Sequence, residues 1–312
     1  MIRAMRGRRH IEGLTLIELM IAMLLGLLIV GAAIGIFISN NQAYRSTQNL
    51  GRIQETGQIA FEMMAKDIRE AGANPCDVSI PVANVIDDAA TNWYTNWDQP
   101  IFGYDNGAMS GSKAGTDAIH VLREADDAVT VKNHSGTSLE VESSPHATGA
   151  LAMVCDHKQL ALFRVGAANA ATIGHEASAG NCSDLLGVAP APCATGAVYV
   201  YPPNSVVSGL RAARWYVADN GRGGSSLFMQ VGGGAAQEIA EGVADMRITY
   251  LQPDISATDY VPASSIAANL WGGVKAARIV MTVEGPEANA AVGGGKISRR
   301  IEHVVNLRSR NP

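Results

Sequence analysis

Apolar and polar residues are distributed very unevenly along this chain. From Leu19 to Ile38 there are 20 consecutive residues without a charged or strongly polar side chain. A helix of this length can cross the hydrocarbon core of a bilayer. No comparable run follows, so the pattern predicts one N-terminal membrane segment ahead of a single large soluble portion.

Behind the apolar run the pattern becomes amphipathic. From Ile53 to Ile68 apolar residues recur at steps of three and four positions, with charged residues such as Asp67 between them. Such spacing places the apolar residues on one face of a helix that packs on a domain. The pattern stops before Pro75. We therefore expect one long helix over 14–71; the alternative is two unrelated helices with a break near Asn40.

Beyond residue 75 the pattern is that of strands. Short segments rich in β-branched residues alternate with clusters of Gly, Ser, Asn and Pro, which favour hairpin loops. The candidate strands are Ala118–Leu122, Val129–Lys132, Ser138–Val141, Leu151–Val154, Leu160–Val165, Ala197–Tyr201, Leu210–Val217, Ser226–Val231, Asp245–Leu251, Ala276–Glu284 and Ile297–Leu307. We predict an α+β fold, in which the long N-terminal helix, with a membrane half and an amphipathic half, packs on a mostly antiparallel β-sheet head domain.

Two segments fit this pattern less well. Residues 77–116 form a long insertion, whose aromatic side chains we interpret as local packing rather than a binding face. In the last candidate strand Ile301 and Val305 fall on one face, on which Arg299 and His303 are exceptions. The packed face of this strand is therefore not expected to be uniformly apolar.

The four cysteines, Cys76, Cys155, Cys182 and Cys193, all lie outside the membrane segment. An even number of cysteines in a non-cytoplasmic domain indicates two disulfides, for which three pairings exist. A Cys182–Cys193 bond would close a short loop, leaving Cys76–Cys155 to tie the end of the helix to the sheet. Metal binding is the alternative, but the chain has no Cys-x-x-Cys and no His at ligand spacing.

The composition restricts the function. The 312 residues carry a formal net charge of −5, and 47% of them are hydrophobic. Such a chain is not disordered and does not bind nucleic acid through a broad basic surface. The sequence contains no Gly-x-Ser-x-Gly, His-Glu-x-x-His or Walker-loop motif. The acidic pairs Asp87-Asp88 and Asp126-Asp127 could bind calcium, although most acidic pairs are simply solvated. We therefore expect a non-enzymatic protein without a cofactor, a metal or a nucleic-acid partner.

The first residues are strongly basic. Four arginines and one glutamate give residues 1–13 a net charge of +3, which keeps them cytoplasmic and directs the rest of the chain outward. An ordinary signal peptide has a shorter apolar core and a following Ala-x-Ala site, so we expect this span to remain attached. Glu18 lies at the edge of the span, where a carboxylate at bilayer depth costs about 2–3 kcal/mol and needs a partner. The alternative is that Glu18 lies in the headgroup region.

The order of these features is more specific than any one of them. A basic leader, Gly13, an apolar residue, Thr15, two apolar residues and Glu18 stand directly before the apolar helix. This order resembles the class III signal of type IV pilins and type II secretion pseudopilins. The resemblance implies that a prepilin peptidase cleaves between Gly13 and Leu14 and methylates Leu14, a position usually held by Phe. It implies a leader peptide over 1–13, a transmembrane and filament-core helix over 14–38, an amphipathic half of that helix over 39–72, and a periplasmic β-rich head domain over 73–312.

Cleavage would also supply Glu18 with a partner. It creates a positive amine on Leu14, and in a filament the Glu18 carboxylate of one subunit can meet the Leu14 amine of a neighbour. Such a pair in a low-dielectric core can set the axial register between subunits even if its net stabilisation is small. Glu18 is therefore the expected carboxylate for assembly. Removal of the leader would leave 299 residues with a net charge of −8.

The length of the chain and three further segments indicate which kind of pilin it resembles. Major pilins and most pseudopilins are much shorter, whereas minor pilins of the PilW kind have large domains, and segments 238–250, 274–279 and 301–308 resemble their strands. The resemblance implies a single-pass inner-membrane minor pilin that primes type IV pilus assembly and is incorporated at or near the pilus tip. Its implied partners are the prepilin peptidase, other minor pilins, the major pilin and a tip adhesin. The alternatives are a minor, J-type pseudopilin of type II secretion and a single-pass anchored periplasmic enzyme or binding domain.

Overall fold

The computed structural model of the chain describes residues 15–87, 89–188, 193, 196–286 and 295–310. It contains one long α-helix, α1 (Leu16–Arg69), and two β-sheets. Every strand pair is antiparallel except β1 (Val82–Asn84) with β7 (Leu160–Arg164), which is parallel. The predicted α+β fold is confirmed.

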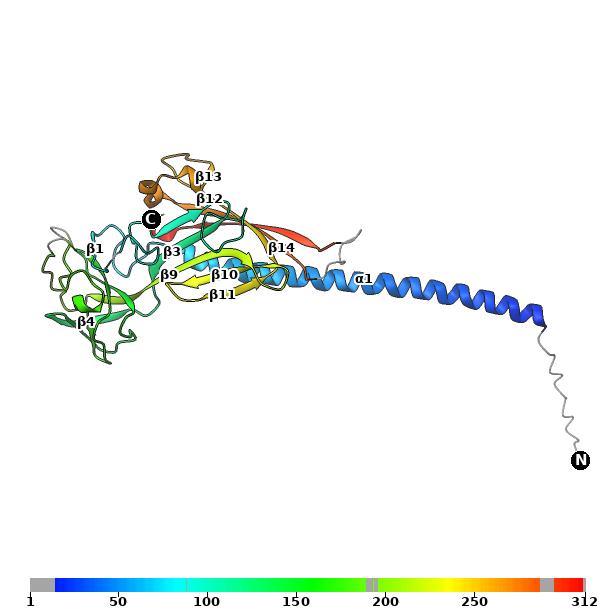
Figure 1. The fold of residues 1–312 in the computed structure, drawn as a ribbon, viewed down its shortest axis with the longest axis horizontal. Coiled ribbons are helices and arrows are strands. Elements are labelled where there is room, and N and C mark those ends of the chain that lie inside the picture. Colours follow the sequence, from blue (N-terminus) through cyan, green and yellow to red (C-terminus); the bar gives the residue numbers. More distant parts are fainter. Residues whose placement is uncertain (1–14, 88, 189–192, 194–195, 287–294, 311–312) are drawn as a thin grey trace, which may run out of the picture. The chain divides into compact units, whose positions relative to one another are not determined.

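Figure 1 traces α1 as a single uninterrupted helix. Its bounds agree with the expected helix to within two residues at each end, and the alternative of a break near Asn40 is wrong. Gly72 follows the helix with a φ of 74°, a left-handed conformation that favours glycine. Its N–H donates to the Leu122 carbonyl (2.8 Å), so the chain turns away from the helix directly onto a strand.

The larger sheet has eleven strands, centred on β9 (Val206–Asp219). The first half of β9 pairs with β4 and β6, and its second half with β3 and β10, so this one strand joins two groups of strands. The other strands of the sheet, besides β1 and β7, are β2 (Ile101–Tyr104), β3 (Ala118–Glu124), β4 (Val129–Ser135), β5 (Ser138–Val141), β6 (Leu151–Cys155), β8 (Thr172–Gly174), β10 (Ser225–Val231) and β11 (Ala236–Glu241).

The smaller sheet has four strands in the order β13-β12-β14-β15. Its strands are β12 (Val243–Leu251), β13 (Tyr260–Pro262), β14 (Ala276–Glu284) and β15 (Ser298–Asn306). Four short 3-10 helices complete the described elements: η1 (Ala177–Ala179), η2 (Ala263–Ser265), η3 (Ala268–Gly273) and η4 (Arg308–Arg310).

The second half of α1 packs against both sheets. Its buried stripe includes Ile53, Ala60, Met64 and Ile68, each at most 1% exposed, at the spacing of one helix face. Gly57 lies against side chains of β14 and β15, while the helix end reaches β3 and β9 through polar contacts described below. The amphipathic pattern therefore corresponds to a helix that contacts both sheets.

One candidate strand is wrong, and several strands were not anticipated. Residues 197–201 belong to no sheet, whereas every other candidate overlaps an observed strand. Strands β1 and β2 lie inside the segment 77–116, and β8, β11 and β13 were also missed. Most of the missed strands have only three or four residues, too few for alternation to be recognised. Aromatic residues of 77–116 pack within the protein, but some of their partners lie outside the segment: Trp93 lies against His120 and Phe102 against Trp271.

Candidate functional site

The N-terminus of α1 is capped by Thr15. Its Oγ1 and its carbonyl oxygen both accept from the Glu18 N–H, at 3.3 and 3.1 Å. Thr-x-x-Glu is the sequence of a capping box, in which the first residue satisfies a backbone N–H that the helix leaves unpaired. The sequence analysis treated Thr15 only as a position in the signal, although its spacing from Glu18 could have identified the cap.

Glu18 occupies the first turn of α1, where the partial positive charge of the helix N-terminus favours a carboxylate. Its side chain is exposed and makes no ion pair within the described part of the chain. The predicted cleavage residues Gly13 and Leu14 lie outside the described residues. The expected pairing of Glu18 with a neighbouring N-terminus therefore remains a prediction.

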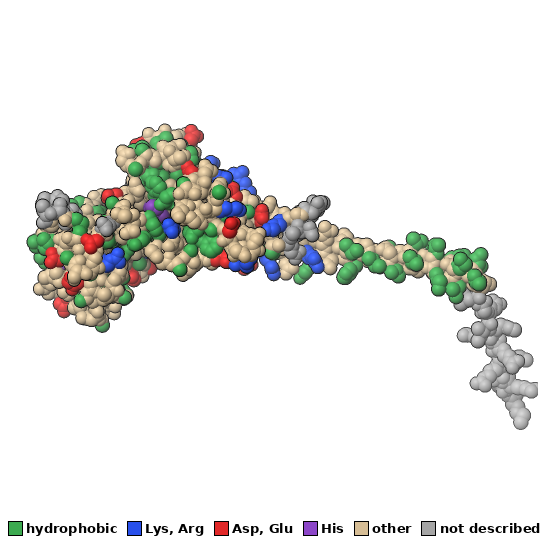
Figure 2. Space-filling view, in the orientation of Figure 1, with side chains coloured by type: hydrophobic (Ala, Val, Ile, Leu, Met, Phe, Trp, Pro, Cys, Tyr) green, Lys and Arg blue, Asp and Glu red, His purple; other side chains and the backbone are tan. Residues whose placement is uncertain are grey.

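The first half of α1 buries none of its apolar side chains against the described protein. Leu16, Leu27 and Phe37 are 79%, 76% and 69% exposed, and α1 contains the one candidate membrane span among the described residues. Figure 2 shows the apolar side chains clustered along this stretch. Exposure of so much contiguous apolar surface marks a site for a membrane or for other proteins.

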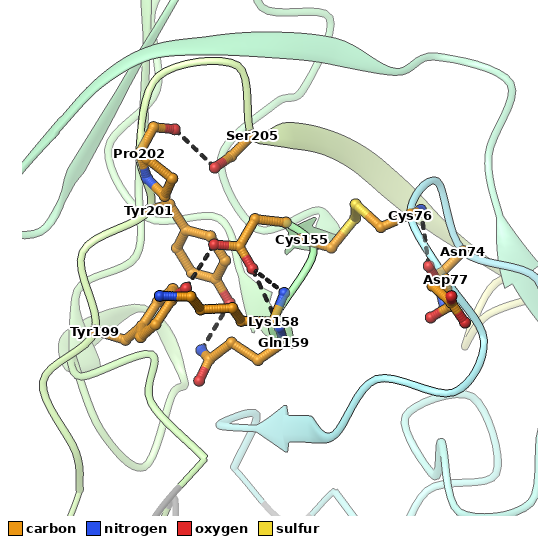
Figure 3. The surroundings of a disulfide bond; sticks show 11 residues. Asn74, Cys76, Asp77, Cys155, Lys158, Gln159, Tyr199, Tyr201, Pro202 and Ser205 are labelled. Atoms are coloured by element: carbon orange, nitrogen blue, oxygen red, sulfur yellow. Dashed lines mark hydrogen bonds between the residues drawn. A yellow bond between two sulfur atoms is a disulfide. The ribbon is translucent and has the colours of Figure 1, made fainter.

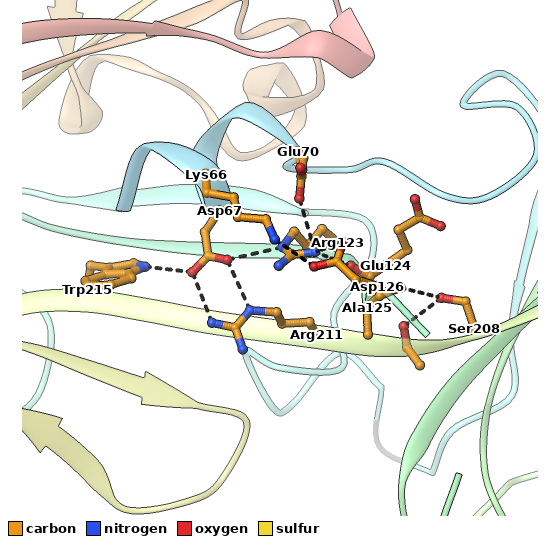
Figure 4. A network of polar contacts seen from close by, with 11 residues as sticks. Lys66, Asp67, Glu70, Arg123, Glu124, Ala125, Asp126, Ser208, Arg211 and Trp215 are labelled. Atoms are coloured by element: carbon orange, nitrogen blue, oxygen red, sulfur yellow. Dashed lines mark hydrogen bonds and ion pairs between the residues drawn. The ribbon is translucent and has the colours of Figure 1, made fainter. Parts of the chain in front are cut away.

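The second half of α1 is fixed by a buried ionic cluster around Asp67 (Figure 4). The Asp67 carboxylate is 3% exposed and accepts from the Nε atoms of Arg123 and Arg211, both at 3.1 Å. The Trp215 indole N–H donates to its other oxygen, also at 3.1 Å. These donors come from β3 and β9, so one helix residue connects two strands of the larger sheet.

The cluster corrects the expectation for Asp67, which was placed between the apolar positions as a polar residue. It lies within the packed face, because two guanidinium groups and an indole compensate the loss of its water. Its position in the last turn of the helix is unfavourable for an anion, which makes these partners necessary. Its partners lie 56 to 148 positions away along the chain, so no local pattern identifies the cluster.

A second tie follows the helix directly. Cys76 and Cys155 form a disulfide with a Cα–Cα distance of 6.1 Å, and Cys182 and Cys193 form another with a Cα–Cα distance of 5.2 Å. These are the two disulfide bonds that the sequence analysis considered. The first connects the segment after α1 to the last residue of β6, so the helix end is linked covalently to the larger sheet.

A polar network lies beside the first disulfide (Figure 3). An open cavity of about 520 Å³ adjoins the same disulfide. The Tyr199 hydroxyl donates to Asp156 at 2.5 Å, and burial together with this carboxylate raises the pKa of Tyr199 to about 12. Asp77, Asp156 and His157 line the cavity. The described residues contain no group of three or more ligands that could hold a metal ion.

The Asp126-Asp127 pair considered for calcium has partners of other kinds. Asp126 pairs with Lys66 at 2.7 Å, and Asp127 accepts from the Gly209 N–H at 2.8 Å. Asp87 accompanies Asp88, which lies outside the described residues. The Asp126-Asp127 pair thus serves the packing of the strand ends against α1 and β9.

Two histidines are buried deeply enough to lose their usual basicity. Burial lowers the pKa of His120 to about 4, and burial together with the neighbouring His134 lowers the pKa of His175 to about 4. The Nε2 atoms of His134 and His175 lie 3.0 Å apart, and His134 Nδ1 accepts from the Tyr201 N–H. His120 and His175 are therefore uncharged at neutral pH and form part of the core.

One comparison with known proteins identifies a motif. Residues 8–34 match the prokaryotic N-terminal methylation motif. No curated protein and no solved structure matches the chain. At residues 8–34 the protein carries the N-terminal signal of type IV pilins and pseudopilins, and this signal continues into a long apolar helix.

Proposed function

We propose that this protein is a minor pilin that primes assembly of a type IV pilus and is incorporated at or near its tip. The observation that carries the proposal is the methylation motif at residues 8–34, continuous with a helix whose apolar side chains are exposed. A motif of this kind implies processing by a prepilin peptidase and assembly with other pilins. The helix supplies the surface that such assembly requires.

Processing would act at the junction between Gly13 and Leu14. The peptidase removes residues 1–13, and the new amine of Leu14 is methylated. Glu18 then presents its carboxylate from the first turn of α1, three residues beyond the Thr15 cap. In the low-dielectric filament core the Leu14 amine of a neighbour compensates this carboxylate and sets the register between subunits.

The head domain would lie in the periplasm before assembly and on the cell surface afterwards. Two disulfides support this placement, because disulfides persist in oxidising compartments. A large head behind a standard helix suits an initiation complex or a cap better than a densely packed shaft. The proposed partners are other minor pilins, the major pilin and a tip adhesin.

A minor, J-type pseudopilin of type II secretion is the second candidate, because the signal at residues 8–34 serves pilins and pseudopilins alike. The two candidates differ in their partners. Co-purification of the membrane-extracted protein with pilus components supports the first. Co-purification with secretion pseudopilins, together with a secretion defect in the deletion strain, supports the second.

Sequencing of the mature N-terminus tests the proposal directly. The protein extracted from membranes should begin at a methylated Leu14, and Gly13→Ala should leave the leader attached. Gly7→Ala is the matched control, because this glycine lies within the leader and away from the cleavage site. A cellular protein that still begins at Met1 would refute the pilin assignment and leave a single-pass anchored domain.

The role of Glu18 is tested separately from processing. Glu18→Ala should be cleaved normally but should reduce incorporation into sheared pili by about tenfold or more, the effect of losing roughly 1.4 kcal/mol. Glu55→Ala is the control, because Glu55 is another exposed carboxylate of α1 without an ion pair in the described chain. Normal piliation and incorporation in Glu18→Ala would contradict the proposed register contact.

A further inference from the structure

Strand β15 forms an open edge of the smaller sheet. It pairs with β14 over nine residue pairs without a register shift, and no described strand pairs with its other side. The Leu307 N–H donates to the Lys275 carbonyl (2.9 Å), so odd-numbered β15 residues direct their backbone groups to β14. The backbone groups of Arg300, Glu302 and Val304 therefore face away from the sheet.

A groove of about 490 Å³ runs along this open edge, between β15 and α1. Its helix side includes Gln54, Gln58 and Phe61, and its strand side includes Arg299, Ile301 and His303. The rings of Phe61 and His303 stack with their centroids 4.0 Å apart, and Ile301 packs on Gly57. A strand added beside β15 would direct alternate side chains into this groove, since successive residues of a strand face opposite sides.

The charges of this edge do not all have partners. Arg299 has no carboxylate partner in the described part of the chain, and Arg300 is 68% exposed. Arg278 and Arg300 both pair with Glu302, at 3.8 and 3.2 Å, so two guanidinium groups share one carboxylate. Glu62 also lines the groove, so the lining holds two arginines and two carboxylates, and Arg299 is the arginine among them that lacks a carboxylate partner in the described chain. An added strand with a carboxylate near Arg299 would complement this charge.

The edge strand β11 of the larger sheet differs in both respects. Strand β11 has a register shift opposite Leu227 and Phe228, and its Glu238 and Glu241 are both paired with Arg222. Bulges and satisfied charges are common ways to protect an edge strand from pairing with another chain. The β15 strand pairs over nine residues without a register shift, and its Arg299 has no carboxylate partner in the described chain.

We propose that β15 accepts an extended, acidic strand from a neighbouring pilin-type subunit, which adds to the sheet and fills the groove along α1. Strand addition satisfies the outward backbone groups of β15, and the groove and Arg299 select the side chains. The donor's identity as a pilin-type chain rests on the proposed function. The acceptor edge rests on the geometry of β15 alone.

Proline substitution in each of two edge strands, β15 and β11, provides the test. Glu302→Pro removes an outward N–H that the fold does not use, so the sheet should persist while strand addition is lost. Ala236→Pro, on the edge of β11, is the matched control. A photo-crosslinking residue replaces Ser298 in the full-length protein in piliated cells, and the crosslinked peptide is mapped by mass spectrometry. Thermal unfolding of each purified full chain shows whether it remains folded.

The expected crosslink maps to an extended segment with Asp or Glu in a chain that has its own N-terminal methylation motif. Its yield should fall by about tenfold with Glu302→Pro, as for a loss of roughly 1.4 kcal/mol, and stay unchanged with Ala236→Pro. If Glu302→Pro unfolds the protein, Arg299→Glu should lower the yield and Arg299→Lys should preserve it. A crosslink to a helix, to a second copy of this chain, or one insensitive to these variants would overturn the proposal.

Failure of this proposal is distinguishable from failure of the proposed function. The mature N-terminus is sequenced from the same cells. Cleavage at Leu14 with a crosslink that Glu302→Pro and Arg299→Glu leave unchanged refutes only the acceptor edge. A retained leader with a variant-sensitive crosslink to an acidic strand refutes only the pilin identity of the donor.

Discussion

The two halves of α1 belong to one continuous helix but have opposite environments. From Leu16 to Ile38 the helix exposes its apolar side chains, whereas Ile53, Met64 and Ile68 of the second half are almost fully buried. An isolated helix in water is only marginally stable, so the first half depends on lipid or other subunits for its partners. The second half depends on the sheets of its own chain. The four predictions below perturb these environments separately.

The largest expected effect on the second half comes from its covalent tie. Replacing Cys76 and Cys155 together by Ser should lower the free energy of unfolding by roughly 4–5 kcal/mol, from the loop-closure entropy of a 79-residue separation. The Cys182–Cys193 pair, with a separation of 11, should cost roughly 3 kcal/mol when replaced. Denaturant unfolding under oxidising conditions measures both, and a larger loss from the shorter loop would contradict the entropic account.

Removal of the Asp67 carboxylate should have a similar effect without touching the disulfide. Asp67→Ala leaves the Arg123 Nε–H and the Trp215 indole N–H buried without their acceptor, which costs about 3–5 kcal/mol. The thermal midpoint should fall by on the order of 10 °C.

Lys66→Ala is the control for Asp67→Ala. Its ion pair with Asp126 is short, at 2.7 Å, but both side chains are more than half exposed, so the loss should stay below about 1 kcal/mol. Equal losses from the two substitutions would mean that burial of the Asp67 cluster does not determine its contribution.

Acid should weaken the sheets through the buried histidines. Burial lowers the pKa of His120 and His175 from 6.5 to about 4, so below pH 6.5 the unfolded chain binds protons that the folded chain does not. The free energy of unfolding is therefore highest above pH 6.5 and falls as the pH is lowered to about 4. The total loss is up to roughly 3 kcal/mol for each histidine. Urea unfolding at a series of pH values measures this, and His120→Gln should flatten the dependence. His157→Gln, at an exposed position, should not change it.

The smallest expected effect lies in the first half of the helix. Thr15→Ala removes the side-chain cap and should destabilise the first turn by about 1 kcal/mol. Amide exchange in detergent micelles should quicken at Glu18 and Leu19, while the thermal midpoint of the sheets stays constant. Thr15→Ser, which keeps a capping hydroxyl, should behave like the wild type.

Individual residues show how far local pattern extends. The strand over Ala276–Glu284 was predicted with its observed bounds, because alternation over nine residues is a local property. Residues 197–201 are likewise rich in β-branched and aromatic residues but have no strand partner, because pairing depends on which segment lies alongside. His303 and Arg299 appeared as exceptions on an apolar face. His303 stacks on Phe61 and Arg299 borders the groove along α1, so neither enters an apolar core.

The sequence by itself determined the membrane-length helix, the N-terminal methylation motif at residues 8–34 and most of the strands. Each of these follows from residues close together in the chain, whose spacing fixes a face, a length or a recognition order. Only the tertiary structure decided that Asp67 is buried, which of the three cysteine pairings forms, and that β15 keeps an open edge beside α1. These features depend on segments far apart in the chain, and the free energy of burying or pairing them is set by neighbours that no local pattern specifies.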